Sequence, residues 1–502
     1  MSKTAVDLRG RREVFWDDFM IEPDRTKRSA HGLIGLRARK PCGRSGFAEL
    51  RLHKPVKKER VLLLDKPWEG DGCDYYNIFK DEDENGVLYR MYYLGWTMIK
   101  PDGTHNGSDI KVCYAESRDG IKWERPDLGI CKFGRYRKNN IILDQKTDIY
   151  DNFFAFKDTN PNCKPDEKYK GVAECGRDGT LWGYVSTDAK HWTRKALLTK
   201  QGKFDSLNVC HWDKYSGKYR CYIRDFHDNE ETDEYAIRDV RVITSDDFWN
   251  WSEPTMIDFG EQADYPLYTN NVGPYYRADH ILTGFPTRYV QRYGWSKNFD
   301  RLCGQEQRKL RCNLTERLGL TVTDCVFMTS RDGVKFHRFD EAWLTPGPEN
   351  GNNWVYGDCY PAFGMIETPS EYEGAANEIS MYNFEGKWTG KPSNLYRYTV
   401  RLDGFASYYG AYPGRNLVTR PFTFDGDTLK MNFATSARGF MKVKVLDENY
   451  EPFEGFWTTE IFGDRVDSPI DFENGNIADL KGKTVRLALE LCDADIYSFI
   501  IE

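Results

Sequence analysis

The heptapeptide Ser117–Trp123 (SRDGIKW) introduces a pattern that returns three more times along the chain. In each copy a Ser is followed two residues later by Asp and six residues later by Trp or Phe, and the copies begin at Ser117, Ser186, Ser245 and Ser330. Their spacing is of the order expected for propeller blades, because one four-stranded blade takes roughly 40–50 residues plus its loops. We interpret the pattern as scaffold. The Ser and Asp side chains can bond the backbone of a tight turn between outer strands, while the ring packs between blades.

The segments around these copies predict five modules of antiparallel strands. The inner strand of each module is expected at Cys73–Phe79, Asp151–Asp158, Leu207–Asp213, Tyr268–Tyr276 and Cys359–Glu367. The fourth module carries an insertion at about 294–320, and the fifth has no clear Ser-x-Asp turn. Five modules that close one ring predict a five-bladed β-propeller over residues 66–403.

Both flanks of the ring are also rich in strands. Residues 1–65 contain short apolar runs of strand type, Val14–Trp16 and Val61–Leu64, and are expected to form an arm that packs on the propeller and pairs with its last blade. Residues 404–502 alternate short strands with Gly and Asp turns and show almost no helical periodicity, which predicts a C-terminal β-sandwich. The predicted fold class is therefore all-β.

Composition narrows the partners that we expect. The 502 residues carry a formal charge of −7 with mixed signs, so nothing favours a nucleic acid or an anionic membrane. Aromatic residues make up 15% of the chain, which is typical both of sugar-binding surfaces and of all-β folds. A small carbohydrate is the expected partner, and homo-oligomerisation is left open.

Cellular location and cofactors follow from what the chain lacks. Met1–Arg12 is polar, and no apolar run approaches about 18 residues, so neither export nor membrane insertion is expected and a cytoplasmic location is predicted. Thirteen Cys without C-x-x-C pairs predict reduced thiols. There is no zinc-type His/Cys spacing, phosphate loop or dinucleotide motif, so no cofactor or metal is predicted, although an ion on the ring axis is left open.

The five modules, the repeated Ser-x-Asp turn and the C-terminal sandwich together resemble the five-bladed propeller glycoside hydrolases of families 32, 43, 62 and 68. The closing stretch Val485–Phe499 resembles the last sandwich strands of family 32, whose members hydrolyse β-fructofuranosides. Three family 32 motifs, N-D-P-N-G, R-D-P and E-C, are not intact here. Phe156-Lys157-Asp158 echoes the second motif but falls in the second blade. The resemblance thus implies a branch of the superfamily other than the standard invertases.

Glycoside hydrolysis needs one protonated and one ionised carboxyl group beside the scissile bond. In the family that this chain resembles, three acids come from the entries of inner strands in blades one, three and four. Carried over, Asp74 is expected to be the nucleophile or base, Asp205 to orient the substrate and tune pKa, and Glu261 to be the general acid, with Asp264 as its alternative. For each residue the alternative interpretation is a surface carboxylate, one of 78 acidic residues in the chain.

Substrate-binding candidates are polar or aromatic residues in or next to the inner strands. They are Asp151, Asp158, Asn208, Arg224, Asn271, Arg288, Tyr289, Trp354 and Asp358. Asp151 and Asp158 are also rivals for the catalytic roles. An Arg at a strand end can fork onto hydroxyl groups or a sugar carboxylate, but each such residue can equally form an inter-blade salt bridge or part of the core.

The leading functional hypothesis is an exo-acting glycosidase on small oligosaccharides or furanosides. A glycoside phosphorylase is the alternative within enzymes, with Arg224, Arg288 and His211 available to bind phosphate. A non-catalytic carbohydrate-binding propeller is the alternative from another class. Convergence of the acids on one pocket within about 10 Å favours hydrolysis, added basic groups favour phosphorolysis, and scattered acids favour a binding protein.

Overall fold

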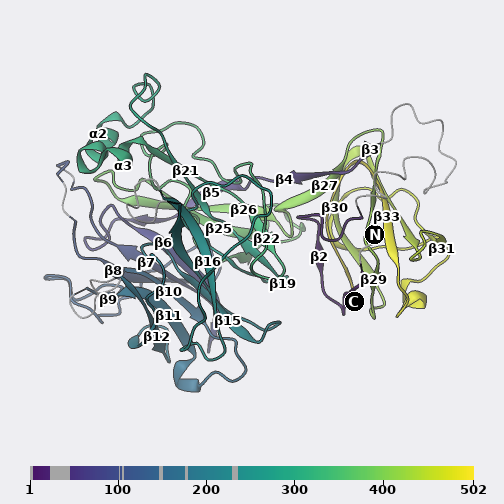
Figure 1. The fold of residues 1–502 in the computed structure, drawn as a ribbon, viewed down its shortest axis with the longest axis horizontal. Helices are drawn as coiled ribbons and strands as arrows, with labels where there is room; N and C mark the ends of the chain where they lie inside the picture. The colour runs from purple at the N-terminus through teal and green to yellow at the C-terminus, as the bar shows by residue number, and fades with distance from the viewer. Residues whose placement is uncertain are drawn as a thin grey trace.

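The computed structural model describes residues 4–22, 46–100, 102–104, 107–145, 151–175, 179–228 and 236–502. Figure 1 shows a ring of sheets and, beside it, a smaller layered domain at the C-terminal end of the chain. Extended strands run between the two domains. None of the described helices has the length and apolar character that a membrane span requires.

Five four-stranded antiparallel sheets form the ring, which confirms the predicted five-bladed β-propeller. Blade one is β6 (Asp74–Asp83), β7 (Gly86–Gly95), β8 (Lys111–Ser117) and β9 (Ile141–Asp144). Blade two is β10 (Asp151–Lys157), β11 (Tyr169–Cys175), β12 (Thr180–Ser186) and β13 (Thr193–Thr199). Blade three is β14 (Val209–Asp213), β15 (Lys218–His227), β16 (Ile237–Ser245) and β17 (Thr255–Met256). Blade four is β18 (Gly273–Tyr275), β19 (Ala278–Gly284), β22 (Met328–Ser330) and β23 (His337–Arg338).

Blade five closes the ring with a strand from the other end of the chain. It consists of β24 (Ile366–Thr368), β25 (Glu378–Glu385) and β26 (Ser393–Arg401), and β5 (Val56–Leu64) pairs antiparallel with β26 as the fourth strand. The expected pairing of the arm with the last blade is thus present. It also explains why this blade has no Ser-x-Asp turn: its third strand leads into the C-terminal domain and not into a fourth strand.

The repeated turn has the geometry that its residues predict. Ser117 Oγ accepts a hydrogen bond from Gly120 N at 2.9 Å, and Asp119 Oδ1 accepts from the next two backbone N–H groups at 2.8 and 2.7 Å. The other three copies make the same bonds. The residue after each Asp has positive φ, and in three copies its carbonyl accepts a hydrogen bond from a Tyr hydroxyl of the neighbouring blade. The turn therefore caps one blade and ties it to the next.

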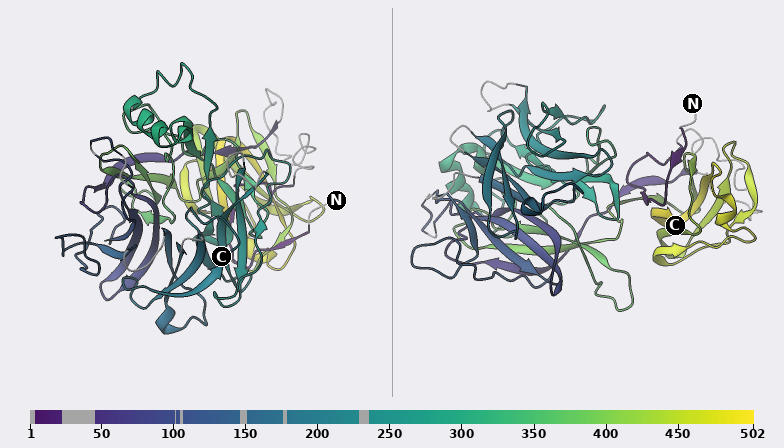
Figure 2. Two further views of the ribbon diagram at one scale, coloured as in Figure 1. Left: turned by 60° about the vertical axis from the view of Figure 1, so that its left-hand side comes forward. Right: turned by 90° about the horizontal axis from the view of Figure 1, so that it is seen from below.

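The insertion in blade four contains the helices that the sequence pattern did not predict. The hairpin of β20 (Thr287–Gln291) and β21 (Thr321–Cys325) carries α2 (Gln305–Leu314) and α3 (Glu316–Leu320), which stand out from one side of the ring in Figure 2. Two buried arginines of α2 fix it in place. Arg308 donates to Gly319 O at 3.0 Å, and Arg311 donates to the carbonyl of Lys387 in blade five. The insertion is thereby held at the end of the ring where the inner strands begin.

The C-terminal strands form the layered sheets of a β-sandwich. They are β27 (Ala406–Gly410), β28 (Arg415–Val418), β29 (Phe422–Thr423), β30 (Leu429–Leu446), β31 (Pro452–Trp457), β32 (Asp464–Pro469) and β33 (Arg486–Ile501). Four short strands of the arm, β1 (Val6–Asp7), β2 (Glu13–Val14), β3 (Gly46–Phe47) and β4 (Glu49–Leu52), pair with these strands. The arm, which we expected to pack on the propeller, therefore gives only β5 to the ring.

The junction between the two domains is a buried cluster. Trp16 is fully buried, donates from its indole N–H to Asp403 O at 2.8 Å and packs edge-on against Tyr275, Phe327 and Phe405. The Asp403 carboxylate accepts from Arg277 at 2.9 Å and from the Ser498 hydroxyl at 2.6 Å. Arm, propeller and sandwich thus share one apolar and hydrogen-bonded contact.

Candidate active site

A cavity of about 330 Å³ lies where the inner strands begin. Each blade contributes a side chain at or before its inner strand: Asp74, Asp151, Asp205, Tyr268 and Tyr356. The ring brings these positions together because inner strands of all blades start at the same end of the central channel. Three of the five are carboxylates, so the cavity is strongly acidic on the side of blades one to three.

Asp74 is the first residue of β6 and is only 1% exposed. Lys387 Nζ lies 2.6 Å from its Oδ2 and is itself buried. Burial raises the pKa of Asp74, whereas the Lys387 ammonium group counteracts that rise. The other oxygen, Oδ1, makes no hydrogen bond of ordinary geometry within the described part of the chain, although the Trp96 indole is near enough to favour the ionised form. Asp74 is therefore held by Lys387 through one oxygen, while its second oxygen is buried next to the Trp96 indole.

Asp151, Glu174 and Asp205 form a carboxylate cluster, with one oxygen of each lying within 4.8 Å of the others. Burial and then the charge of Asp205 raise the pKa of Glu174 to about 7. The same two causes hold the pKa of Asp151 well above its ordinary value. The side chain of Asp205 is 64% exposed and faces the cavity mouth. At neutral pH the cluster therefore retains protons that isolated carboxyl groups would have lost.

Three arginines line the cavity on the side of blades three and four. Arg224 belongs to β15, Arg238 to β16 and Arg317 to α3 of the insertion. Arg224 donates to Lys203 O at 2.9 Å and lies 3.8 Å from Asp205. Aromatic rings complete the wall, and Trp96 and Trp388 meet edge to face at 5.8 Å. The cavity thus combines acids, cations and flat apolar faces.

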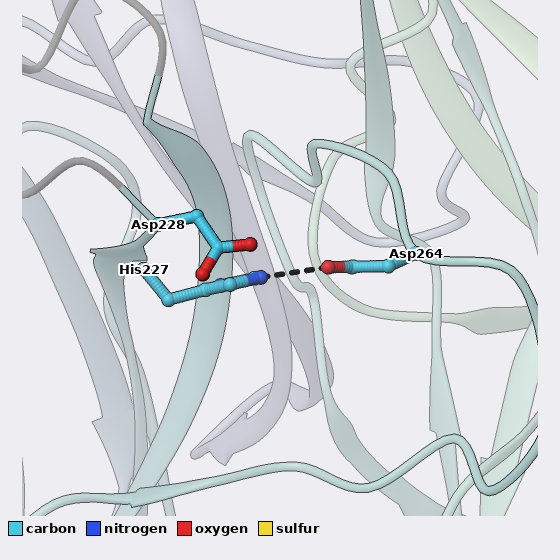
Figure 3. Close-up of side chains that lie close together, drawn as sticks. All are labelled: His227, Asp228 and Asp264. Carbon is cyan, nitrogen blue, oxygen red and sulfur yellow. Dashed lines mark hydrogen bonds and ion pairs between the residues drawn. The ribbon is translucent and has the colours of Figure 1, made fainter.

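Of the three expected catalytic acids, the structure brings Asp74 and Asp205 together and leaves Glu261 out. Glu261 is exposed and is not among the described residues that line the cavity. Its alternative, Asp264, lies outside the cavity as well and accepts from His227 Nε2 at 2.7 Å, as Figure 3 shows. The entry of blade four carries Tyr268 in place of an acid. The expectation of an acid from blade four fails because the loop before that strand turns the acids outward.

His227 belongs to a second polar cluster beside the cavity. Its Nδ1 lies 3.0 Å from Asp239 Oδ2, and its Nε2 contacts Asp264, with Asp228 close by (Figure 3). Burial lowers the pKa of His227, but the two carboxylates raise it on balance. His227, Asp228 and Asp264 could hold a cation, as could Asp151, Glu174 and Asp205. We regard the first group primarily as an imidazolium bridge between two carboxylates.

Several of the predicted substrate-binding residues have structural contacts. Asp158 is buried in an ion pair with Lys170 at 2.5 Å and accepts from the Tyr219 hydroxyl, so the echo of the R-D-P motif is an inter-strand bridge. Arg288 makes a two-pronged pair with Asp324 at 2.9 and 2.7 Å. Both side chains are therefore satisfied by the protein and do not line the cavity.

The remaining candidates support the site or lie elsewhere. Asn208 donates to the carbonyls of Phe204 and Ser206 at 2.9 Å and so shapes the loop that presents Asp205. Tyr289 is buried behind the cavity, where its hydroxyl contacts Arg317 at 3.2 Å.

Trp354, Asp358 and Asn271 do not line the cavity either. Trp354 bonds Gly347 O, and Asp358 accepts from Val355 N at 2.9 Å. Asn271 lines a separate cavity of about 280 Å³ together with His211. Of the predicted binding residues, Asp151 and Arg224 therefore reach the cavity itself.

The sequence interpretation missed four charged residues at the site: Lys387, Arg238 and Arg317, which line the cavity, and Glu174, which lies against two of its lining acids. Glu174 did carry a signal, because a carboxylate interrupts the otherwise apolar strand Gly171–Cys175. Lys387 stands in the β25–β26 hairpin, Arg238 in a mixed strand and Arg317 in the insertion. The sequence around Lys387, Arg238 and Arg317 shows no local pattern that predicts a cavity residue, since these three side chains come together only in the folded ring.

Fold and cavity define a class: a five-bladed β-propeller with acids at the entries of its inner strands and a C-terminal sandwich. Solved structures that it resembles include a thermostable family-43 glycoside hydrolase, at 12% identity over 66% of this chain and 90% of the other, with a TM-score of 0.41. The family 32 β-fructofuranosidase of Bombyx mori matches at 8% identity over 88% and 94%, with a TM-score of 0.40. An N-acetylgalactosamine deacetylase from F. plautii matches at 11% identity over 70% and 95%, also at 0.40.

Neither a family model nor a curated protein matches the sequence. The solved structures that resemble this chain do include glycoside hydrolases of families 43 and 32. Similarity at these identities and scores carries no argument about chemistry, which rests on the residues of the cavity.

Proposed function

We propose that the protein is a glycosidase that hydrolyses a glycosidic bond in the propeller cavity. The observation that carries this proposal is the carboxylate cluster, in which Glu174 holds its proton up to about pH 7 beside Asp205. Glu174 does not itself line the cavity, but one of its oxygens lies within 4.8 Å of oxygens of Asp151 and Asp205, which do line it. A protonated carboxyl group beside an ionised one is the pair that glycoside cleavage requires. A surface ion-binding patch would not need a half-buried acid that retains its proton.

The proposed roles follow from the environments. Glu174 donates its proton to the leaving oxygen, and Asp205 keeps that proton in place through its negative charge. Asp74, oriented by Lys387, acts as base toward water or as nucleophile through the oxygen that Lys387 does not contact. The oxocarbenium-like transition state is stabilised by the surrounding carboxylates. Glu174 thereby takes the part that the sequence assigned to Glu261.

The cavity also limits the substrate. Its size and aromatic lining suit a small ligand bound end-on, which supports exo-action on short oligosaccharides. Furanosides remain the first substrates to test, because the sequence resemblance to family 32 implies them.

The test is a screen of aryl glycosides and short oligosaccharides with the full chain, followed by two matched variants. Glu174→Gln removes the proton donor and is expected to lower kcat by about 10²-fold or more on substrates with poor leaving groups. Glu261→Gln makes the same chemical change at an exposed residue outside both the cavity lining and the carboxylate cluster, and should leave kcat unchanged. A normal rate in Glu174→Gln, or an equal loss in both variants, would refute the assignment. Binding without cleavage of any glycoside would favour a non-catalytic carbohydrate-binding propeller.

A glycoside phosphorylase is the second candidate, because Arg224, Arg238 and Arg317 line the same cavity. Phosphate would replace water as the acceptor of the glycosyl group, and a sugar 1-phosphate would be formed. Arg288 and His211, which the sequence also offered for phosphate, lie outside the cavity. Running the screen with and without phosphate separates the two: a phosphate-independent rate supports hydrolysis, and strict dependence supports phosphorolysis.

A further inference from the structure

The cationic wall of the cavity is not neutralised by the protein. Arg238 lines the cavity, yet no described residue forms an ion pair or hydrogen bond with its guanidinium group, and its Nε is buried without a partner. It lies over the Tyr289 ring at 4.3 Å. Arg317 contacts the hydroxyl of the same Tyr289 at 3.2 Å, so the two guanidinium groups approach one tyrosine from different elements.

Other arginines of this chain show what a structural role looks like. Buried Arg90 pairs with Asp81 at 2.6 Å, and half-buried Arg288 makes two hydrogen bonds to Asp324. Arg238 is half-buried, so its guanidinium group loses part of its water without gaining such a partner, and Arg317 is exposed beside it on the cavity wall. Two guanidinium groups that line a cavity without carboxylate partners among the described residues are suited to bind an anion.

Resting on the proposed function, we infer that Arg238 and Arg317 form an anion subsite that binds a carboxylate or phosphoryl group of the ligand, with Arg224 between this subsite and the carboxylate cluster. Arg224 fits the intermediate position, because it lies 3.8 Å from Asp205 and 5.4 Å from the ring centre of Tyr268, which Arg238 also faces at 5.7 Å. The substrate class is then an acidic or phosphorylated sugar. Inorganic phosphate is the other source of the same chemistry.

The acidic side of the cavity adds selectivity to this arrangement. An anionic group placed near Asp205 would be repelled by the charge of this carboxylate, whereas the same group beside Arg238 and Arg317 would be attracted. The charges of the cavity therefore orient a charged sugar in one direction, with its anionic group toward blade four and its glycosidic bond toward Glu174.

Calorimetric titration of the full chain tests the subsite without any need for turnover. The probes are D-galacturonate, D-glucose 6-phosphate, inorganic phosphate and, as the neutral reference, D-galactose. We expect at least one charged sugar to bind at least 10-fold more tightly than D-galactose. Arg238→Gln should remove that advantage and leave D-galactose binding unchanged, while Arg238→Lys should restore part of it.

Arg301→Gln is the matched control, because Arg301 is exposed on the same insertion and does not line the cavity. If inorganic phosphate binds tightly and charged sugars bind no better than D-galactose, the anion subsite is supported and its ligand is free phosphate. Equal binding of charged and neutral probes, with no phosphate binding, would overturn the subsite, as would an equal loss in Arg301→Gln.

Glu174→Gln separates this inference from the proposed function. If the charged probe binds normally to Glu174→Gln and no glycoside is cleaved by the wild type, the subsite stands and the glycosidase proposal fails. If neutral glycosides are cleaved and charged ones have no advantage in binding, the glycosidase stands and the subsite fails.

Discussion

Asp151, Glu174 and Asp205 are chemically alike as isolated side chains, and the fold places them in different environments. The side chain of Asp205 is exposed, whereas Glu174 and Asp151 are more deeply placed. Their own burial, and then the nearby charge of Asp205, raise the pKa of both Glu174 and Asp151. This division of roles is the chemical core of the proposed function.

Replacing Asp205 with Asn tests that division. The change keeps the shape and removes the charge, so we expect kcat to fall by about 10²-fold, or roughly 3 kcal/mol of transition-state stabilisation. The charge of Asp205 raises the pKa of Glu174, so its loss should lower that pKa from about 7. The alkaline limb of the kcat–pH profile should therefore move to lower pH. An unmoved limb would show that another group donates the proton.

The Ser-x-Asp turn shows how one short element builds a large ring. Its hydrogen bonds are local, since each donor lies within three residues of its acceptor. Local bonds of this kind are readable from sequence, which is why four blades could be located from Ser117, Ser186, Ser245 and Ser330. The hydrogen bond from a Tyr hydroxyl of the neighbouring blade could not be predicted in the same way. It joins residues that lie far apart in the sequence, such as Tyr382 and Gly120.

Removing one Asp from this element should weaken the fold and spare the site. In Asp119→Ala two backbone N–H groups lose their acceptor, so the free energy of unfolding should fall by about 1–2 kcal/mol. Asp127→Ala, at an exposed residue of the same loop region whose contact with Lys138 is 3.9 Å, should change it by less than about 0.5 kcal/mol. Urea denaturation of both variants measures the difference. Equal stabilities would refute the capping role.

At the level of the whole molecule, the propeller and the sandwich are joined through Asp403. This carboxylate is fully buried and contacts Arg12 of the arm, Arg277 of blade four and Ser498 of the sandwich. Burial acts to raise the pKa of Asp403, but Arg277 and Arg12 hold it below its ordinary value. The junction is therefore stabilised by ionised Asp403 above about pH 4 and loses that contribution as the pH falls through the lowered pKa.

Asp403→Asn should loosen this junction. Among the described residues, the guanidinium groups of Arg12 and Arg277 would keep only Asp467 as a counter-charge, and we expect the free energy of unfolding to fall by about 3 kcal/mol. Calorimetry should show the wild-type transition split into two as the domains unfold separately. The exposed Asp471→Asn is the control and should leave one transition. A single unshifted transition in Asp403→Asn would mean that the apolar contact of Trp16 alone holds the domains together.

The thiols of the whole chain give a simpler test. All twelve described cysteines are free, and Cys42, the thirteenth, lies outside the described residues. Since a disulfide typically adds about 2–4 kcal/mol, reductant should leave the Tm unchanged within about one degree. A drop of several degrees would reveal a structural disulfide.

Residue patterns were sufficient for the blades, the C-terminal sandwich and the positions of Asp74 and Asp205 on the cavity, because strand alternation, turn chemistry and the entry of an inner strand are local properties. The catalytic roles expected for these two acids stay predictions. The prediction for the arm was correct in part. β5 pairs with the last blade as expected, but β1–β4 pair with strands of the sandwich. Helices α2 and α3 were missed because the insertion that carries them gave no clear periodicity.

The proposed proton donor and the cations of the cavity were decided by the packing of blades in the ring. Glu174 comes from the second strand of blade two and meets Asp205 only across two blades, whereas Glu261, at the expected spacing, is exposed. Arg238, Arg317 and Lys387 converge from two blades and an insertion. Sequence spacing reports distance along the chain, and the charge and pKa of a cavity depend on distances in space, so these partners become visible only in the folded ring.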